Sequence, residues 1–458
     1  MIKDIVLPEA VKSIFYVLNR NGYEAYIVGG AVRNSILELP VHDWDICTNA
    51  LPEEICKLFR SKGFRVVETG LQHGTVTVMV NCRGYEVTTY RTDGKYSDSR
   101  HPDSVEFVSD IYSDLSRRDF TMNAIAYNDD GFIDPFNGMR DIKNKVIKCV
   151  GVAIDRFTED PLRIMRAVRF AAQLGFHIEN YTNIAMVQTN DGLSKISAER
   201  IQSELCKILI SDHPEYVLDY YIDISPAIPE LNKIMGCSQN NMYHIYDVWN
   251  HTRFALTACR IHELETRLAI LLHDIGKSES KVTENGIDHF YKHTVKSAEI
   301  ADSMLRRLKF ANYVREPVVE LIVNHDITII PKPNKIKKYL NKFGEAQFRR
   351  LLDLRFCDII AHNPYYAKER LWETFHAEEM LNEVLAEEKC FSIKDLAING
   401  KDIMDLGIKE GPNVGKWLNY ALDEVINDRL ENDKEDILSD IDAKLYAERE
   451  ENSDEKMS

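Results

Sequence analysis

Two aspartates separated by a single residue follow a pair of glycines near the start of the chain. The glycines are Gly29 and Gly30, and the aspartates are Asp43 and Asp45. Side chains two residues apart in an extended segment point to the same side, so the two carboxylates can hold a divalent metal. The glycines let the backbone approach a ligand closely, and the helix expected after them offers free N–H groups to phosphate. An anion site beside a metal site predicts metal-dependent nucleotidyl transfer.

The segments that must position these residues alternate between strand and helix. We expect a strand to carry Asp43 and Asp45, and a later strand to carry Glu86, which can supply a third carboxylate or simply face solvent. Short β-branched runs separated by glycine or asparagine predict the remaining strands, so the first third of the chain is α/β with a small mixed sheet. Further strands are expected at residues 26–28, 64–69, 74–80 and 85–90, and helices at 1–20 and 52–62.

A pair of arginines lies in the segment DLSRRDFTMNAIA, residues 114–126. We expect Asp114 to cap a helix that exposes Arg117, Arg118 and Asp119 and buries its apolar residues. Paired arginines are commonly surface charge. Beside a nucleotide site they gain a second interpretation, because the guanidinium fork matches the oxygens of a triphosphate.

From residue 157 the sequence becomes helical. The segment FTEDPLRIMRAVRFAAQLGF predicts one helix with Thr158 as its cap and Pro161 in its first turn, ending at a glycine. Asp160 and Arg163 are three residues apart, which is ordinarily a surface pair on a helix. An aspartate and an arginine can also offer acceptor and donor groups to the edge of a nucleobase.

A second group of potential ligands lies in the helical remainder of the chain. Imidazole and carboxylate groups from separate helices are what a mononuclear or dinuclear metal site in a bundle requires, with a transition metal as the expected ion. Asp326 competes with Asp358 for the last ligand position. The candidate ligands are His251, His273, Asp274, His293, His325 and Asp358.

The composition describes a long acidic chain of 458 residues with a net charge of −16. Its nine cysteines include no CxxC pair, so neither a zinc ribbon nor a disulfide framework is indicated. No apolar run approaches the roughly 18 residues of a membrane span, and the N-terminus lacks a signal-peptide pattern. We therefore expect a cytoplasmic protein with no membrane partner.

Charge is distributed unevenly along the chain. Residues 428–458 form an acidic tail after a small helical unit, whereas residues 332–350 carry seven basic side chains and one acidic one. The basic stretch is compatible with RNA binding, and a solvated helix face is the alternative. A DPFNG turn at 134–138 closes the first domain. The expected domains are residues 1–150, 151–215, 216–375 and 376–458.

Together these motifs resemble those of bacterial class II CCA-adding tRNA nucleotidyltransferases, of the poly(A) polymerase-like family, fused to an HD-type metal phosphohydrolase module. The resemblance rests on GGAVRN, HDWD, RRDFTMNA, DPFNG, EDPLRIMRAVRF, HDIGK and DLAINGKDI, which occur in the family's order. It implies an α+β fold with a polymerase-β-like nucleotidyltransferase head, followed by an all-α neck, HD body and tail. It also implies template-independent addition of CCA to the 3′ end of tRNA from CTP and ATP, with release of pyrophosphate by a two-metal mechanism.

The resemblance further implies roles for individual residues. Asp43 and Asp45 would bind the catalytic Mg²⁺ ions, with Glu86 as a further candidate ligand. One departure is Asn34, which stands where the family usually has aspartate. Asp160 and Arg163 would pair with the Watson–Crick edge of CTP or ATP. The other residues expected around the nucleotide are Gly29, Gly30, Arg33, Arg117, Arg118, Asp119, Asn123, Arg166 and Arg169.

For the HD module, the resemblance implies His251, His273, Asp274 and Asp358 as metal ligands. His293 and His325 would extend this set to a second metal, and an additional phosphohydrolase activity would follow.

Several alternatives remain at the level of sequence. A bacterial poly(A) polymerase shares the signature, although ETGLQHGTVTV at 68–78 and the acidic C-terminus favour the CCA-adding branch. CC-only or A-only addition is a further alternative, and the polar segment 91–104 resembles the flexible element of enzymes that add all of CCA. An HD-type metal phosphohydrolase with an RNA-gripping N-terminal domain, and a non-enzymatic RNA-binding or scaffold protein, are alternatives of other classes. The expected partners are tRNA, CTP and ATP, and no DNA partner is expected.

Overall fold

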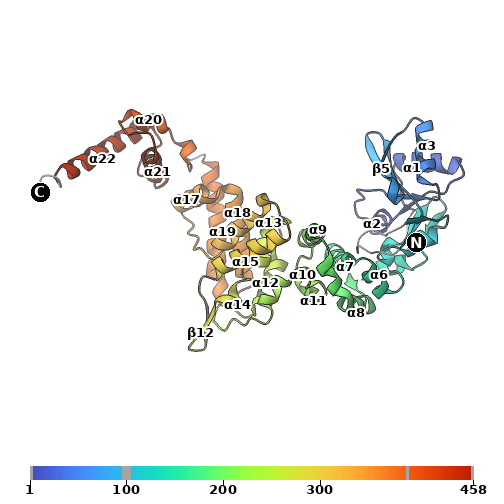
Figure 1. Ribbon diagram of the computed structural model, residues 1–458. Helices are drawn as coiled ribbons and strands as arrows, with labels where there is room; N and C mark the ends of the chain where they lie inside the picture. The colour runs from blue at the N-terminus through green and yellow to red at the C-terminus, as the bar shows by residue number, and fades with distance from the viewer. Residues whose placement is uncertain (1–3, 95–104, 388–390, 455–458) are drawn as a thin grey trace. The chain divides into compact units, whose positions relative to one another are not determined.

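The computed structural model describes residues 4–94, 105–387 and 391–454. The chain forms two compact units, the first comprising residues 1–232 with 306–310 and the second comprising 233–305 with 311–458. The first unit holds the main sheet, and the second is largely helical (Figure 1). The expected α+β fold class is confirmed, whereas the finer division into four domains stays a prediction.

Seven short strands form the sheet of the first unit, in the order β3-β4-β5-β2-β1-β8-β9. Neighbouring strands are antiparallel except β2 and β5, which are parallel, so the sheet is mixed as expected. The strands are β1 (Tyr26–Val28), β2 (Ile46–Thr48), β3 (Arg65–Gly70), β4 (Thr75–Val80), β5 (Arg83–Thr89), β8 (Ala126–Asn128) and β9 (Gly131–Ile133).

The strand expected to carry Asp43 and Asp45 begins only after them, at Ile46. The N–H of Val28 donates to the carbonyl of Asp45 at 3.1 Å, and this bond is the last between the two segments. Gly29, at φ 69°, then turns the partner chain away. The two aspartates therefore lie in a non-helical segment that leads into the sheet, and that segment lacks a ladder partner on the β1 side.

Eleven helices accompany this sheet in the described part of the first unit. They are α1 (Glu9–Arg20), α2 (Gly30–Ile36), α3 (Pro52–Ser61), α4 (Ile111–Ser116), α5 (Gly138–Lys143), α6 (Ala153–Glu159), α7 (Leu162–Leu174), α8 (Asn180–Thr189), α9 (Ala198–Leu209), α10 (Tyr216–Asp219) and α11 (Tyr221–Ile224). Two small pairings complete the unit, namely β6 (Arg91–Asp93) with β7 (Val105–Phe107) and β10 (Val146–Ile147) with β11 (His177–Ile178).

The expectation that Asp114 caps a helix is wrong. Helix α4 begins earlier, and Asp110 caps it by accepting from the amides of Tyr112 and Ser113. Asp114 lies inside α4 and is 1% exposed. The local capping preference is the same for both aspartates, so only the position of the first helical residue decides between them.

The helix expected over residues 157–176 is interrupted at Asp160. Helix α6 ends at Glu159, and α7 begins at Leu162. Asp160 has φ −139° and ψ 97°, because a residue before proline avoids the helical region. Thr158, the expected cap, lies within α6 and donates its hydroxyl to the carbonyl of Ile154. The break turns the Asp160 side chain out of the helical register of Arg163.

The second unit is a helical bundle with a β-hairpin. The candidate metal ligands lie on its helices or directly after them, and the hairpin consists of β12 (Lys281–Glu284) and β13 (Ile287–Phe290). The helices are α12 (Val248–Ala258), α13 (Leu264–Leu272), α14 (Lys277–Ser280), α15 (His293–Arg307), α16 (Asn312–Asn324), α17 (Pro333–Phe343), α18 (Glu345–Ile360), α19 (Pro364–Ala386), α20 (Gly400–Asp405), α21 (Pro412–Ile426) and α22 (Lys434–Asp454).

Much of the acidic segment at the C-terminus is folded. Helix α22 buries Ile437, Ile441 and Leu445 in a core that also contains Trp417 and Ile403. The charge of this segment therefore occupies the exposed face of an amphipathic helix, which corrects the expectation of an acidic tail outside the helical unit.

The basic stretch at 332–350 is largely neutralised by carboxylates of the same unit. Lys337 pairs with Asp428 at 2.9 Å and Lys338 with Asp423 at 2.7 Å, while Arg349 and Arg350 pair with glutamates. Four of its seven basic side chains thus form ion pairs within the unit. This pairing favours a structural role for the stretch.

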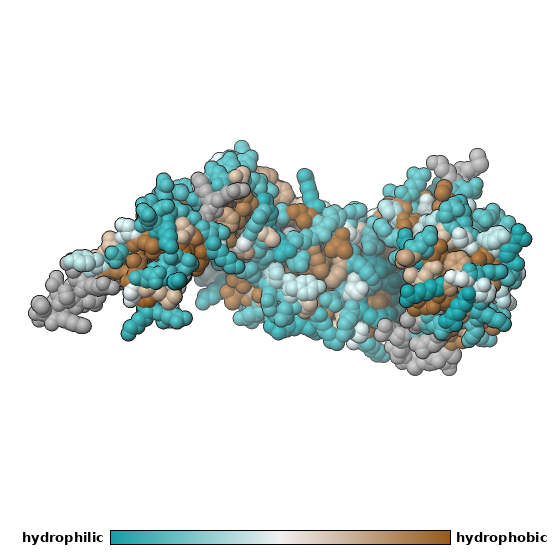
Figure 2. Space-filling model, turned by 90° about the horizontal axis from the view of Figure 1, so that it is seen from above, coloured by the Kyte–Doolittle hydropathy of each residue, from teal (hydrophilic) through white to brown (hydrophobic). Residues whose placement is uncertain are grey.

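Among the described residues, every helix is too short or too polar to cross a lipid bilayer. On the face drawn in Figure 2, hydrophilic residues predominate and apolar residues gather in separate patches.

Asp134 holds the DPFNG turn through two backbone N–H groups. Its carboxylate accepts from Gly138 at 2.6 Å and from Met139 at 2.9 Å, at the start of α5. Replacement of a side chain that caps a helix costs about 1 kcal/mol. We expect Asp134→Ala to lower the free energy of unfolding by about this amount and to speed hydrogen exchange at the first amides of α5. Asp130→Ala, at an exposed position in the β8–β9 turn, is the matched control; equal exchange in the two variants would contradict the prediction.

Candidate active site and metal centre

A polar cleft of about 670 Å³ lies in the first unit and collects every residue expected around the nucleotide, together with Asp43 and Asp45. Its lining comes from the β1–α2 turn, the segment before β2, the segment after α4, and helices α7 and α9. The expected residues that line it are Gly29, Gly30, Arg33, Asp43, Asp45, Arg117, Arg118, Asp119, Asn123, Asp160, Arg163, Arg166 and Arg169. Leu162, Phe170 and Arg200 line it as well.

Two carboxylates, those of Asp43 and Asp45, line the sheet end of this cleft, and Glu86 lies outside its lining on the neighbouring strand. Strand β5 runs parallel to β2 with Ile46 opposite Val87, which places Glu86 beside Asp45. Desolvation raises the pKa of Asp45, with Arg118 lowering it and Asp43 raising it further. Desolvation also raises the pKa of Glu86, and the negative charges of Asp45 and Asp43 raise it further. A bound cation would relieve this repulsion, and carboxylate oxygens suit a hard divalent metal. Among the described residues, the groups whose ligand atoms already lie within 4.8 Å of one another are both in the second unit, so Asp43, Asp45 and Glu86 would have to draw closer around an ion.

Gly29 is needed for close packing at the cleft. A Cβ atom on this residue would lie 3.0 Å from Nη1 of Arg118, and its positive φ disfavours other residues. The glycine thus allows the Arg118 guanidinium to lie directly against the β1–α2 turn, where α2 begins.

Three arginines surround the ring of Phe170. The guanidinium carbons of Arg33, Arg166 and Arg169 lie 4.8, 5.4 and 4.2 Å from its centroid. Burial lowers the pKa of Arg33 to about 10 and that of Arg169 to about 10, and neighbouring arginines add to the effect. Nε of Arg169 is buried without a hydrogen-bond partner in the structure. A cationic cluster whose protonated form is destabilised favours an anionic ligand, and a triphosphate has the required charge.

Two further arginines are oriented by Asp114. Its carboxylate accepts from Arg117 at 2.8 Å and from Arg118 at 3.1 Å. Burial alone would raise the pKa of Asp114, but the two arginines hold it below its usual value. Arg117 and Arg118 were expected on an exposed helix face; instead their side chains are only 17% and 20% exposed.

Asp119 connects the segment after α4 to helix α7. It accepts from Arg166 at 2.5 Å, from the side chain of Asn123 at 3.0 Å and from its neighbouring amide of Phe120. Asn123 in turn accepts from Arg33 at 2.7 Å. Burial alone would raise the pKa of Asp119, but Arg166 and these hydrogen bonds hold it well below its usual value. The carboxylate is therefore an anion at neutral pH.

Asn34, the departure from the family pattern, also orients Arg33. Its side-chain oxygen accepts from Nε at 3.1 Å and Nη2 at 2.9 Å, and its amide donates to the carbonyl of Pro40. The neutral amide makes the two contacts that hold the guanidinium plane.

Asp160 and Arg163 do not pair with each other. Asp160 binds Arg200 of α9, with Nη2 3.0 Å from Oδ2. Arg163 donates to Glu159 at 2.7 Å and to the backbone carbonyls of Arg156 and Arg117. The two side chains expected to meet a base are thus each held by a different partner, and both line the cleft.

Sequence reasoning missed Arg200 and Phe170 as site residues. Neither was named as a candidate, and Phe170 occurs only within the segment expected to form a helix over residues 157–176. Arg200 lies 40 residues from Asp160 along the chain, so no local spacing indicates their contact. Of the polar segment 91–104, residues 91–93 form strand β6, and residues 95–104 lie outside the described part.

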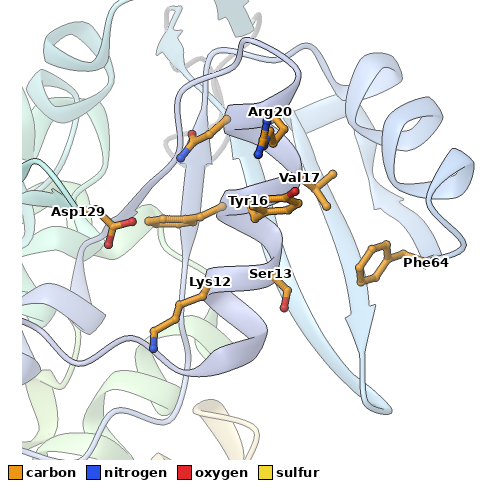
Figure 3. Close-up of a pocket in the computed structure, with 9 residues that line it drawn as sticks. Lys12, Ser13, Tyr16, Val17, Arg20, Phe64 and Asp129 are labelled. Carbon is orange, nitrogen blue, oxygen red and sulfur yellow. The ribbon is translucent and has the colours of Figure 1, made fainter.

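Another cavity, of about 680 Å³, lies against α1. Figure 3 shows Tyr16 and Arg20 beside each other on this helix, and the guanidinium lies 5.4 Å from the ring centroid. Lys12 pairs with Glu9 at 2.8 Å. Arg20 and Lys12 of this cavity thus already have partners on α1. The candidate catalytic residues of the unit lie in the polar cleft instead.

The second unit brings all six expected metal ligands together. Two groups could each hold an ion, namely His251, His273 and Asp358, and His273, Asp274 and His325. Oδ2 of Asp274 lies 3.2 Å from Nε2 of His273, and Oδ1 lies 3.5 Å from Nε2 of His293. Asp274 therefore lies between the two pairs of imidazoles.

Four of these histidines are held in the same way. The Nδ1 atoms of His251, His273, His293 and His325 lie 2.7 to 3.3 Å from backbone carbonyl oxygens. If Nδ1 carries the proton in each ring, Nε2 keeps its lone pair and faces the other ligands. Oδ2 of Asp274 already lies beside the Lys277 ammonium, whereas Oδ1 is buried without a hydrogen-bond partner and faces the imidazoles of His293 and His325, which fits a site that a cation completes.

Residues outside the expected ligand set also surround this cluster. Lys277 pairs with Asp274 at 2.7 Å. His362 is 7% exposed, and its Nδ1 lies 3.8 Å from Asp358. Its ring centroid is 4.4 Å from that of His244. Burial lowers the pKa of His362 to about 4, so a neutral imidazole faces the cluster. Asp326, the expected competitor, is exposed, whereas Asp358 is 5% exposed.

Comparison with protein families places known domains along both units. The poly A polymerase head domain matches residues 25–148, and the probable RNA and SrmB-binding site of polymerase A matches residues 175–225. A tRNA nucleotidyltransferase domain 2 matches residues 287–441.

Relatives and solved structures extend the match over nearly the whole chain. The CCA-adding enzyme of Thermotoga maritima complexed with tRNA shares 20% identity at a TM-score of 0.60, over 96% of this chain and 97% of that one, which shows the fold. The Bacillus stearothermophilus CCA-adding enzyme in complex with CTP is 31% identical at a TM-score of 0.72, over 97% of this chain and 98% of that one. The CCA-adding enzyme of Ligilactobacillus salivarius is 34% identical, covering 97% of this chain and 98% of its own length. That of Lactobacillus helveticus is 34% identical over 454 residues, covering 96% of this chain and 100% of its own length. This chain therefore belongs to the CCA-adding enzyme family of tRNA nucleotidyltransferases.

Proposed function

We propose that this protein adds CCA to the 3′ end of tRNA, using CTP and ATP and releasing pyrophosphate. The observation that carries the proposal is the single cleft in which acidic metal donors, an arginine cluster and the Asp160–Arg163 pair converge. The names of its relatives agree with this reaction. We expect it to act in the cytoplasm.

In this reaction the arginines of the cleft bind the nucleotide, and the carboxylates bind the metal that stabilises charge. The tRNA 3′-hydroxyl attacks the α-phosphorus of the nucleotide, and pyrophosphate leaves. Arg33, Arg166 and Arg169 lie where they can bind the triphosphate, since they form the cationic cluster around Phe170. Asp43 and Asp45, with Glu86 beside them, would hold Mg²⁺. Bound Mg²⁺ would supply charge neutralisation and a lowered pKa for the attacking hydroxyl.

Nucleotide choice is assigned to Asp160 and Arg163. Cytosine and adenine both carry an exocyclic amino group, which can donate a hydrogen bond to a carboxylate. Both also carry a ring nitrogen, which can accept a hydrogen bond from a guanidinium. Uracil and guanine present a carbonyl oxygen at the same position, which repels a carboxylate. A protein pair of this kind selects CTP and ATP without a nucleic-acid template.

Nucleotide incorporation into a defined tRNA tests the reaction itself. With tRNA lacking its CCA end, we expect two cytidines from CTP alone and one further adenosine when ATP is added. A long adenosine tail would identify a poly(A) polymerase, and a product that stops after CC in the presence of both nucleotides would identify a CC-adding enzyme.

The acidic metal donors are expected to be essential for transfer. Asp43→Asn should lower kcat by at least about a thousandfold, because a catalytic metal supplies several kcal/mol of transition-state stabilisation. Steady-state incorporation of CTP is the measurement, and Asp130→Asn is the control at an exposed carboxylate. Activity within tenfold of the wild type in Asp43→Asn would refute this role.

We propose a second function for the histidine cluster, namely metal-dependent hydrolysis of phosphomonoesters or cyclic phosphates. The supporting observation is that six buried or half-buried ligands from separate helices converge around Asp274. His251, His273 and Asp358 would hold one ion, and His293 and His325 a second, with Asp274 shared between them. A transition metal suits this mixture of imidazole and carboxylate.

The histidine cluster can be separated from the transfer reaction by substitution. We expect His273→Ala to reduce bound metal, measured by elemental analysis of the purified full chain, and to abolish hydrolysis of 2′,3′-cyclic AMP. CTP incorporation should stay within about twofold of the wild type, because the two sites are built from different residues in different units. His376→Ala, at a half-buried histidine of α19 outside the cluster, is the control. Loss of incorporation in His273→Ala with hydrolysis retained would contradict both assignments.

A further inference from the structure

We propose that Arg200 is a specificity-determining positioning residue that acts through Asp160. Its guanidinium fixes the carboxylate so that one oxygen faces the exocyclic amino group of the incoming base. The inference rests on the nucleotide selection proposed above and adds a residue from α9 to it.

The contact between the two side chains is close and sheltered. Nη2 of Arg200 lies 3.0 Å from Oδ2 and 3.3 Å from Oδ1 of Asp160. The side chains are 20% and 15% exposed. Oδ1 also accepts from the amide of Leu162 at 3.1 Å. One face of the carboxylate is thus fixed by the protein, and the free lone pair of Oδ2 remains available in the cleft.

Asp160 needs such a partner because its side chain projects from a non-helical residue and is not fixed by packing within a helix. It occupies the extended residue between α6 and α7, outside either helix. Arg163 follows three residues later, and Arg117 also lines the cleft, so other guanidinium groups compete for the carboxylate. In the structure Arg163 is held instead by Glu159 at 2.7 Å. With Arg200 removed, Asp160 is free to turn toward Arg163 and consume the donor that the base requires.

Helix α9 is suited to this task because it is anchored independently of Asp160. One turn after Arg200, Glu204 pairs with Arg169 of α7 at 3.0 Å and is 4% exposed. The two residues are four positions apart and therefore lie on one face of α9. Helix α9 thus forms ion pairs with Arg169 and Asp160, which both line the cleft. The pair with Arg169 holds α9 in place, so Arg200 can hold the Asp160 carboxylate in one orientation.

The chemical consequence concerns discrimination more than turnover. A correctly oriented carboxylate accepts a hydrogen bond from cytosine and repels the carbonyl oxygen of uracil. An incorrectly oriented one does neither. Discrimination of this kind is worth about 1 to 3 kcal/mol for each well-made contact, which corresponds to at least about a fivefold change in the selectivity ratio.

The test compares CTP and UTP with the full chain and a tRNA that lacks CCA. For Arg200→Gln we expect the kcat/KM ratio of CTP to UTP to fall by about tenfold, chiefly through a higher KM for CTP. Arg200→Lys, which keeps the charge but not the planar fork, should restore part of the ratio. Glu199→Gln, an exposed neighbour on the same helix that pairs with Lys309, should leave the ratio unchanged.

A double-mutant cycle distinguishes action through Asp160 from a general effect on folding. Arg200→Gln should have no further effect on the ratio in an Asp160→Ala background. Additive effects, an unchanged ratio in Arg200→Gln, or an equal loss for CTP and UTP that Arg200→Lys does not restore would each overturn the inference.

Equilibrium binding of CTP and UTP without tRNA provides a second readout of the same contact. Wild-type protein that prefers CTP in binding but does not extend tRNA would refute the proposed function alone. In that case the effect of Arg200→Gln on the binding preference would still decide the role of Arg200.

Discussion

The buried carboxylate of Asp119 is the interaction on which the nucleotide cleft depends. It joins Arg166 of α7 to Asn123, and Asn123 joins it to Arg33 of α2. These bonds connect the sheet-bearing part of the first unit, which supplies metal donors, to the helix that carries Arg163. Removal of Asp119 or of Arg166 would leave the other charge buried without its partner. Breaking a buried ion pair in this way costs about 3 to 5 kcal/mol of stability. The Asp119 carboxylate therefore fixes the position of the metal donors relative to the helix that carries Arg163.

Concentrated like charge is the second constraint on this cleft. Arginines gather around Phe170, while the carboxylates of Asp43, Asp45 and Glu86 gather at the sheet. Each group is unfavourable without its ligand, since the pKa of Arg33 is lowered and that of Asp45 is raised. A nucleotide triphosphate with its metal satisfies both groups at once. The folding energy of the surrounding unit maintains this arrangement before the ligand arrives.

The second unit also concentrates potential metal ligands, but they are mainly imidazoles. Backbone carbonyls orient the four imidazoles through Nδ1, and Asp274 lies between them. Here the ligands are imidazoles and not mainly carboxylates, which favours softer metals. The protein therefore combines two potential metal sites of distinct character, each built within its own unit.

The sequence by itself determined which residue types could do chemistry and much of the secondary structure around them. The glycine pair, the two aspartates and the paired arginines carry short-range patterns, and the strands at 26–28 and 74–80 follow from local propensity. Two local patterns were also misjudged, because two nearby aspartates offer the same capping side chain and because the residue before a proline avoids the helical region. Asp110 caps α4 in place of Asp114, and the helix expected to run through Asp160 is broken before Pro161. Only the tertiary structure brought Arg200 to Asp160 and His244 to His362, because contacts between residues far apart along the chain depend on how helices pack and leave no periodic signal in the sequence.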